Sequence, residues 1–262
     1  MLEERPAAVA GAFYPAEPEA LSTHIDAYLA AAHAKDAIIP KAVIVPHAGY
    51  VYSGPVAASA YVQLSQARAA IQRVVLLGPT HRVAIRGLAT SSAGTFRTPL
   101  GCVPVDREAQ AQVLDLPQVR IDDRAHAEEH SLEVQLPFLQ RVLEKFSIVP
   151  FGVGDATDSE VAEVLERLWG GDETLLVISS DLSHYHDYET ARRLDLSTTR
   201  CIEALDAASL GWESACGRIP IRGLLRCARR HGLRAVTLDL RSSGDTAGPR
   251  SEVVGYGAYA LA

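Results

Sequence analysis

The chain has 262 residues and 48% of them are hydrophobic, so it is long enough to bury a substantial core. Its formal net charge of −7 argues against nucleic acid as the main partner, because binding a phosphate backbone needs a concentrated basic surface. No apolar stretch reaches the ~18 residues that a membrane span requires. The charged start, residues 1–6, lacks the apolar region of a secretory signal, and no cysteines form a Cys-x-x-Cys pair. We therefore expect a cytoplasmic protein with reduced thiols.

The first half of the chain alternates between helical and strand patterns. Short Val- and Ile-rich runs bounded by Gly and Pro predict buried strands, and amphipathic or small-residue stretches predict helices. In chain order we expect helix 16–34, strand 42–46, helix 55–68, strand 73–77, an antiparallel excursion over 87–105 with a hairpin around Gly94, and helix 106–114.

The second half continues the alternation. Residues 128–144 form the most regular helical pattern, with leucines three and four residues apart, and Pro137 predicts a kink or a break within it. The later elements are predicted as strand 147–153, helix 158–168, strand 174–179, helices 187–208 and 219–231, and closing strands 234–240 and 252–259. With short connections and no long linker, this order predicts one α/β domain spanning 1–262, with a mainly parallel central sheet flanked by helices.

Histidines follow three of the predicted strands. His47 comes directly after the first, His81 follows a Gly-Pro-Thr turn after the second, and His184 lies just beyond strand 174–179. Ligands of open α/β sheets bind at the carboxyl ends of the parallel strands. We therefore expect these imidazoles to meet at one edge, where they suit Fe, Zn, Cu or Ni.

Other polar residues near these tips are candidates for catalysis. Asp181 can be a metal ligand, a partner that orients a histidine, or the N-cap of the next helix. His184 can be a general acid or base, since its ordinary pKa lies near neutrality. His130 lies at the start of the predicted helix 128–144, where a cation is disfavoured, so we expect a neutral imidazole that faces the site. His126 fits a plain loop residue.

Cys216 precedes the predicted helix 219–231. A thiol near a helix amino terminus has a lowered pKa and can be a thiolate ligand or a nucleophile. The other cysteines have apolar or helical neighbours and are expected in the core: Cys102, Cys201 and Cys227. Nucleotide-binding loops and the Gly-x-Ser-x-Gly elbow of serine hydrolases do not occur in the sequence.

Six motifs, taken together, resemble the Memo family, whose prokaryotic branch is called AmmeMemoRadiSam system protein B. They occur in family order and cover nearly the whole chain. They are residues 5–15 (RPAAVAGAFYP), 46–50 with 52–54 (PHAGY, YSG), 78–81 (GPTH), 129–137 (EHSLEVQLP), 179–184 (SSDLSH) and 216–218 (CGR). The resemblance implies a fold like that of the class III extradiol dioxygenases, which hold non-haem Fe(II) with two histidines and one carboxylate.

The resemblance also implies a ligand set. Two histidines and a cysteine, here His47, His81 and Cys216, would hold the metal, and Asp181, His184 and His130 would line the same pocket. The cysteine replaces the carboxylate of the dioxygenases. Fe(II) is the expected metal, with Cu or Zn as alternatives because thiolate is a softer ligand that is also readily oxidised.

Three functions fit these residues. The first is a metal-binding, dioxygenase-like oxidoreductase that acts with the AMMECR1-like protein and radical SAM protein implied by the family name. The second is a non-catalytic scaffold whose inherited pocket binds a small molecule or a peptide. The third is thiol-dependent hydrolysis by Cys216 with a histidine base. The chain lacks a Cys-x-x-x-Cys-x-x-Cys cluster motif, so it would not itself be the radical SAM partner.

Overall fold

The computed structural model describes residues 3–34 and 39–262 and is built around a twisted central sheet. The strands follow the order β10-β12-β2-β9-β3-β8-β4-β7, and β11 also pairs with β12. The four inner strands run parallel: β2 (Ala42–Val45), β9 (Thr174–Ser179), β3 (Arg73–Pro79) and β8 (Ser147–Val153). This confirms the predicted α/β fold with a mainly parallel central sheet flanked by helices.

Burial on both faces explains why the inner strands are so apolar. Every residue of β2 and β9 is buried, and the runs Ala-Val-Ile-Val and Leu-Leu-Val-Ile leave no polar face for solvent. The predicted strands 147–153 and 174–179 match β8 and β9 residue for residue. The carboxyl ends of β2, β3 and β9 therefore meet at one edge of the sheet.

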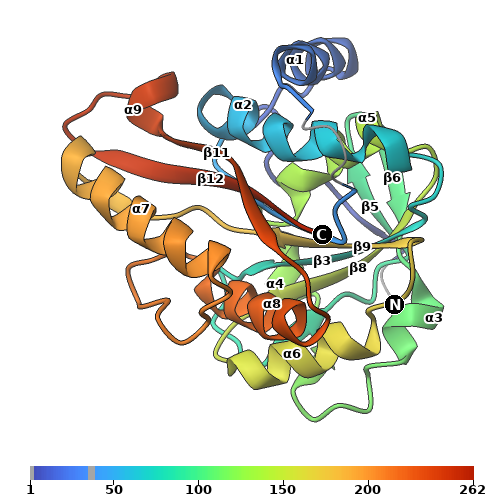
Figure 1. Cartoon of the computed structure of the whole chain (residues 1–262). Coiled ribbons are helices and arrows are strands. Elements are labelled where there is room, and N and C mark those ends of the chain that lie inside the picture. Colours follow the sequence, from blue (N-terminus) through green and yellow to red (C-terminus); the bar gives the residue numbers. More distant parts are fainter. Residues whose placement is uncertain (1–2, 35–38) are drawn as a thin grey trace.

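Antiparallel pairing extends the sheet beyond the four inner strands on both sides. β12 (Val253–Leu261) lies antiparallel to β2, and β11 (Ala235–Ser242) and the short β10 (His184–His186) both pair with β12. On the opposite side β4 (Leu88–Thr90) pairs antiparallel with β8, and β7 (Val119–Ile121) runs parallel to β4. The short α9 (Ser243–Thr246) lies in the connection from β11 to β12 (Figure 1).

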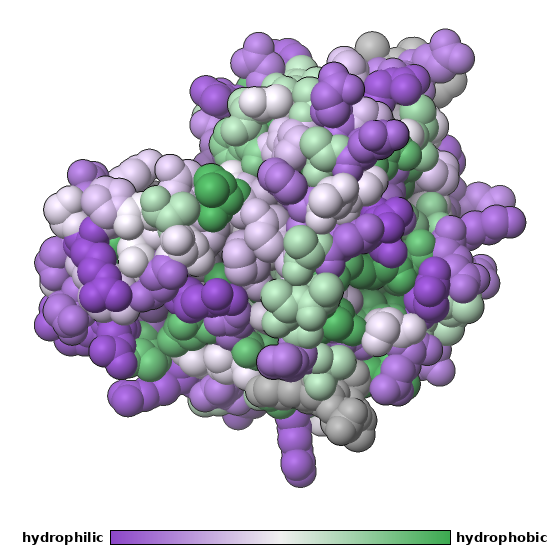
Figure 2. Space-filling view, turned by 90° about the horizontal axis from the view of Figure 1, so that it is seen from above, coloured by the Kyte–Doolittle hydropathy of each residue, from purple (hydrophilic) through white to green (hydrophobic). Residues whose placement is uncertain are grey.

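Helices cover both faces of the sheet and enclose one hydrophobic core on each side (Figure 1). One face carries α2 (Tyr50–Tyr61), the 3₁₀ turn η1 (Val62–Ala67) and α5 (Leu136–Val142), with α1 (Pro18–Ala31) packed outside α2. The other face carries α3 (Arg107–Ala111), α6 (Asp158–Arg167), α7 (Tyr188–Glu203) and α8 (Arg218–Arg230). On the surface seen from above, hydrophobic residues show mainly in recesses between hydrophilic ones (Figure 2). Among the described residues, no helix is both long and apolar enough to cross a membrane.

A second, three-stranded sheet places the predicted hairpin differently. Its order is β1 (Glu4–Arg5), β5 (Thr95–Thr98) and β6 (Gly101–Pro104). The turn between β5 and β6 lies at residues 99–100 and ends at Gly101, whose φ of +119° suits glycine. Gly94 instead precedes β5 and donates its N–H to the carbonyl of Glu3. The predicted position of the hairpin turn, at Gly94, was therefore wrong by about the length of one strand.

The helix predicted over 128–144 is the largest departure. Residues 128–132 are not helical; α4 (Arg124–Ala127) precedes them, and the 3₁₀ turn η2 (Glu133–Gln135) leads into α5. Glu129 and Glu133 are buried and accept hydrogen bonds from other segments, which a regular surface helix would not allow. Pro137 lies in the first turn of α5, where its missing N–H costs nothing. The predicted break exists, but it falls before the proline.

Candidate metal centre

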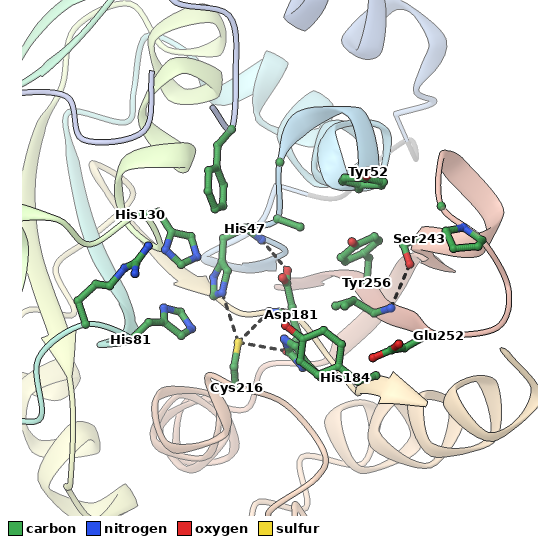
Figure 3. A pocket seen from close by; sticks show the side chains of 18 residues that line it. His47, Tyr52, His81, His130, Asp181, His184, Cys216, Ser243, Glu252 and Tyr256 are labelled. Carbon is green, nitrogen blue, oxygen red and sulfur yellow. Dashed lines mark hydrogen bonds between the residues drawn. The ribbon is translucent and has the colours of Figure 1, made fainter. Parts of the chain in front are cut away.

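Six predicted residues line one cavity of about 780 Å³, and four of them come from the tips of three parallel strands and the start of α8 (Figure 3). His47, His81 and Asp181 follow the ends of β2, β3 and β9. Cys216 approaches from the residues just before α8. Those four, together with His130 and His184, line the cavity.

His47, His81 and Cys216 form a set that can hold a metal ion. One donor atom from each lies within 4.8 Å of the other two. Nε2 of His47 is 3.3 Å from Sγ of Cys216. Two ligands on one tetrahedral metal, at ordinary metal–nitrogen and metal–sulfur distances, are about 3.6 Å apart. The donor set therefore fits an ion with only small side-chain adjustments, and its chemistry suits Zn, Cu or Fe.

His47 is held as a neutral imidazole. Burial lowers its pKa to about 3, and the neighbouring His81 contributes in the same direction. Its backbone N–H donates to Oδ1 of Asp181 at 2.7 Å, and Nδ1 lies 3.0 Å from Oγ of Ser179. A neutral ring with one nitrogen engaged is the form in which histidine binds metals.

His81 is fixed by Glu129, a residue that the sequence analysis did not assign to the site. The backbone N–H of His81 donates to Oε2 of Glu129 at 2.5 Å, and Nδ1 is 2.9 Å from Oε1. Burial alone would raise the pKa of Glu129, but the hydrogen bonds from His81 outweigh it and lower the pKa to about 2. An ionised carboxylate on Nδ1 leaves Nε2 of His81 as the free nitrogen.

Cys216 is held by the backbone of Asp181. The N–H of Asp181 donates to Sγ at 3.3 Å, and the N–H of Cys216 donates to the carbonyl of Asp181 at 3.2 Å. Burial raises the pKa of the thiol to about 12, and the charge of Asp181 adds to this. The expected lowering of the pKa by the adjacent helix start was therefore wrong, because burial outweighs it. A thiol with a raised pKa is not an activated nucleophile, which argues against the hypothesis of hydrolysis by Cys216.

Asp181 is a positioning group for the backbone of His47. It is buried, and burial raises its pKa, while the N–H of His47 that it accepts opposes the rise. The N-cap hypothesis for Asp181 was wrong, since α7 is capped by Asp187, whose side chain accepts the N–H of Thr190. The carboxyl group also does not orient His184, whose Nδ1 lies 2.8 Å from the carbonyl of Leu182.

His130 faces the cavity from the loop before η2. Its ring stacks on that of His81, with the ring centroids 4.7 Å apart. The ring of Phe13 is tilted against it, with the centroids 4.6 Å apart. Burial lowers its pKa to about 4, and the neighbouring His47 contributes in the same direction, which agrees with the expected neutral form. It does not belong to the group with His47 and Cys216; its own close group is with His81 and Glu129.

Other candidate residues lie outside the centre. His126 is buried rather than a plain loop residue, and its Nε2 lies 3.0 Å from the carbonyl of Ala89. Cys227 is buried as expected and Cys201 is half-buried. Cys102 is exposed, which contradicts its expected place in the core, because β6 turns it toward solvent beside Glu4.

Aromatic side chains form much of the remaining cavity wall: Phe13, Tyr52, Tyr185 and Tyr256. Tyr185 is 72% exposed and has a φ of +60°, an uncommon conformation outside glycine that concentrates at functional sites. Arg82 and Glu252 add one positive and one negative charge at the lining. The volume and the mixed lining suit a small organic molecule or a peptide side chain.

Comparison with known proteins identifies the family of this chain. The model of the Memo-like protein family matches residues 5–260. The chain belongs to the Memo family. A MEMO1 family protein of Aquifex aeolicus is 38% identical over 264 residues, covering 96% of this chain and 97% of the relative. One from Aeropyrum pernix is 40% identical over 274 residues, covering 94% and 95%.

A solved structure shares the fold at low sequence identity. It is the crystal structure of the uncharacterized protein JW3007 from Escherichia coli K12, with a TM-score of 0.51 and 14% identity. The match covers 83% of this chain and 98% of that chain. At this identity the likeness supports the α/β architecture of the Memo chain and carries no statement about its chemistry.

Proposed function

We propose that this Memo family protein binds Fe(II) through His47, His81 and Cys216 and is a metal-dependent, dioxygenase-like oxidoreductase. The observation that carries the proposal is the meeting of these three donors, within 4.8 Å of one another, at a cavity of about 780 Å³. Three protein ligands leave coordination positions open toward that cavity. The resemblance to class III extradiol dioxygenases supports iron as the metal.

The residues around the centre support a catalytic role. A bound metal supplies Lewis-acid and redox chemistry. Because Nδ1 of His184 bonds to the carbonyl of Leu182, its Nε2 is the nitrogen left to take or give a proton. His130 adds an imidazole that its lowered pKa of about 4 keeps neutral. The aromatic wall offers apolar surface against which an organic substrate can pack.

The cysteine supports a second candidate, a scaffold that binds metal or a small ligand without turnover. Thiolate favours Cu(I) or Zn as well as iron, and it is readily oxidised beside a metal and oxygen. In either case the family resemblance supports joint action with an AMMECR1-like protein and a radical SAM protein.

Metal content tests the proposal. We would purify the wild type, His47→Ala and Cys216→Ser without oxygen and measure bound iron, with Cys102→Ser as the control for loss of an exposed thiol. The expected result is stoichiometric iron in the wild type and in the control, and little in the other two variants. Equal, near-zero metal in all four after reconstitution with Fe(II) would overturn it.

Turnover separates the enzyme from the scaffold. A broad set of catechols would be screened with Fe(II) and oxygen, comparing the wild type with His184→Ala. Turnover that is lost in His184→Ala while iron is retained supports the enzyme. Binding of ligands with no turnover by any form supports the scaffold.

A further inference from the structure

A buried chain of hydrogen bonds runs from Tyr61 in α2 through Gln135 and Ser179 to His47. The phenol of Tyr61 lies 2.8 Å from Oε1 of Gln135, and Nε2 of Gln135 lies 2.7 Å from Oγ of Ser179. Oγ of Ser179 lies 3.0 Å from Nδ1 of His47. Each of these four residues is at most 2% exposed, so the polar side-chain atoms must find their hydrogen-bond partners within the protein.

Two neighbours fix the orientation of the Gln135 amide. Nε2 is 2.9 Å from the carbonyl of Pro46, which can only accept a hydrogen bond. Burial raises the pKa of Tyr61 well above its usual value, so its phenol keeps a hydrogen to donate to Oε1. A reversed amide would place two carbonyl oxygens against each other. Both amide hydrogens therefore go outward, one to Pro46 and one to Ser179.

The hydrogens around Ser179 can then be counted. A serine hydroxyl has one hydrogen and two acceptor positions. Its hydrogen goes to the carbonyl of Ser131 at 2.5 Å, since that atom can only accept. One acceptor position receives the hydrogen of Gln135. The hydroxyl therefore has no hydrogen left for His47 and can only accept from it.

We propose that Ser179, ordered by Gln135, is a positioning residue that holds His47 in the tautomer with its hydrogen on Nδ1. Nε2 then presents its lone pair to Cys216, 3.3 Å away, before any metal arrives. The tautomer itself follows from the hydrogen-bond count alone; its consequence for metal binding rests on the proposed function. A ring prepared in this way need not exchange tautomers when the ion binds.

Nitrogen NMR of the metal-free protein tests the tautomer directly. Long-range proton–nitrogen correlation in ¹⁵N-labelled protein shows which ring nitrogen carries the hydrogen, and His47→Asn identifies the signals of His47. We expect Nδ1 to be protonated in the wild type and the hydrogen to spread over both nitrogens in Ser179→Ala. We also expect the Kd of Ser179→Ala for Zn²⁺ or Fe²⁺ to be about 10–100-fold higher.

Thr199→Val is the matched control, because it also removes a buried hydroxyl, one that bonds to Tyr259 away from the cavity. It should leave the tautomer and the Kd unchanged. If the His47 ring of the wild type carries its hydrogen on Nε2, the inference is wrong even if metal binds. The wild-type NMR spectrum alone therefore tests the tautomer, also if Ser179→Ala does not fold. If the wild type carries the hydrogen on Nδ1 but binds no metal, the proposed function is wrong and the inferred tautomer stands. Unchanged tautomer and Kd in folded Ser179→Ala would end the positioning role.

Discussion

The carboxylate of Glu129 contacts both the backbone and the ring of His81: Oε2 accepts the backbone N–H at 2.5 Å, and Oε1 lies 2.9 Å from Nδ1. Oε1 also accepts the N–H groups of His130 and Ser131 at 3.0 and 2.9 Å. One buried carboxylate thus ties the loop after β3 to the loop before η2. It fixes the ring plane of His81 and places the hydrogen on Nδ1, as in carboxylate–histidine–metal triads.

The first prediction concerns this carboxylate. Glu129→Gln keeps the shape but removes the charge, so metal affinity should fall by about 10–100-fold, the usual cost of losing a partner behind a metal-binding histidine. Titration calorimetry with Zn²⁺ measures the change. Glu128→Gln is the matched control, because its side chain is the exposed neighbour in the chain. Equal affinities for the two variants would show that Glu129 is not part of the centre.

The second prediction separates metal ligands from cavity wall. His130 lies outside the group formed by His47, His81 and Cys216, although its ring stacks on that of His81. His130→Gln should therefore keep stoichiometric metal, whereas His47→Gln should lose it. Metal analysis after reconstitution and gel filtration gives both numbers. Loss of metal in His130→Gln to the same extent would make His130 a ligand.

The third prediction concerns proton release. Burial raises the pKa of Cys216 to about 12, so the thiol is protonated in the metal-free protein, whereas the depressed pKa of His47 leaves that ring already neutral. Binding must displace the thiol proton, and affinity should rise about tenfold per pH unit between roughly pH 7.5 and 9. Calorimetric titrations in buffers of different ionisation enthalpy count the proton. A pH-independent Kd of the wild type would contradict a thiolate ligand.

How much the sequence predicted depended on whether its signal was local. Runs such as Leu175–Ile178 are short and have no polar face, which favours inner strands, and β8 and β9 were predicted to the residue. Once the strands are parallel, their carboxyl ends share an edge, which is why His47 and His81 were expected to meet. The strand pattern thus supplied both the fold class and the place of the centre.

The partners of the histidines could not be predicted in the same way. Glu129 and Gln135 lie in a stretch whose leucines repeat at helical spacing, so their polarity fitted the solvent face of a helix. In the structure Glu133 is buried and pairs with Arg5, 128 residues earlier in the chain. Such long-range polar contacts override local periodicity. Ser179, at the end of an apolar strand, likewise shows its role only when Gln135 and His47 are seen beside it.

The fourth prediction is a pH dependence of stability. Burial raises the pKa of Asp195 to about 6. The carboxylate accepts the backbone N–H of Ser183 at 3.0 Å, and this hydrogen bond opposes the rise but does not cancel it. The folded state therefore binds this proton more tightly than the unfolded state, whose pKa is near 3.8. Stability from this group is fully present below pH 3.8, falls as the pH rises from 3.8 to 6, and stays low above that.

Asp195→Asn removes that ionisation and keeps an oxygen to accept from Ser183. It should be more stable than the wild type at pH 8, by up to about 3 kcal/mol for a shift of roughly two pKa units, and similar to it at pH 4. Urea unfolding at both pH values measures the difference. A difference of the same size at pH 4 and pH 8 would show that the charge of Asp195 is not the cause.

X-ray absorption at the zinc edge of the zinc-loaded protein tests the central claim most directly, since zinc leaves the thiol in its reduced state. The account predicts one sulfur at about 2.3 Å and imidazole nitrogens at about 2.0–2.1 Å, with the sulfur absent in Cys216→Ser and an imidazole absent in His81→Gln. A wild-type spectrum with only oxygen and nitrogen neighbours, unchanged by both substitutions, would contradict a centre built from His47, His81 and Cys216.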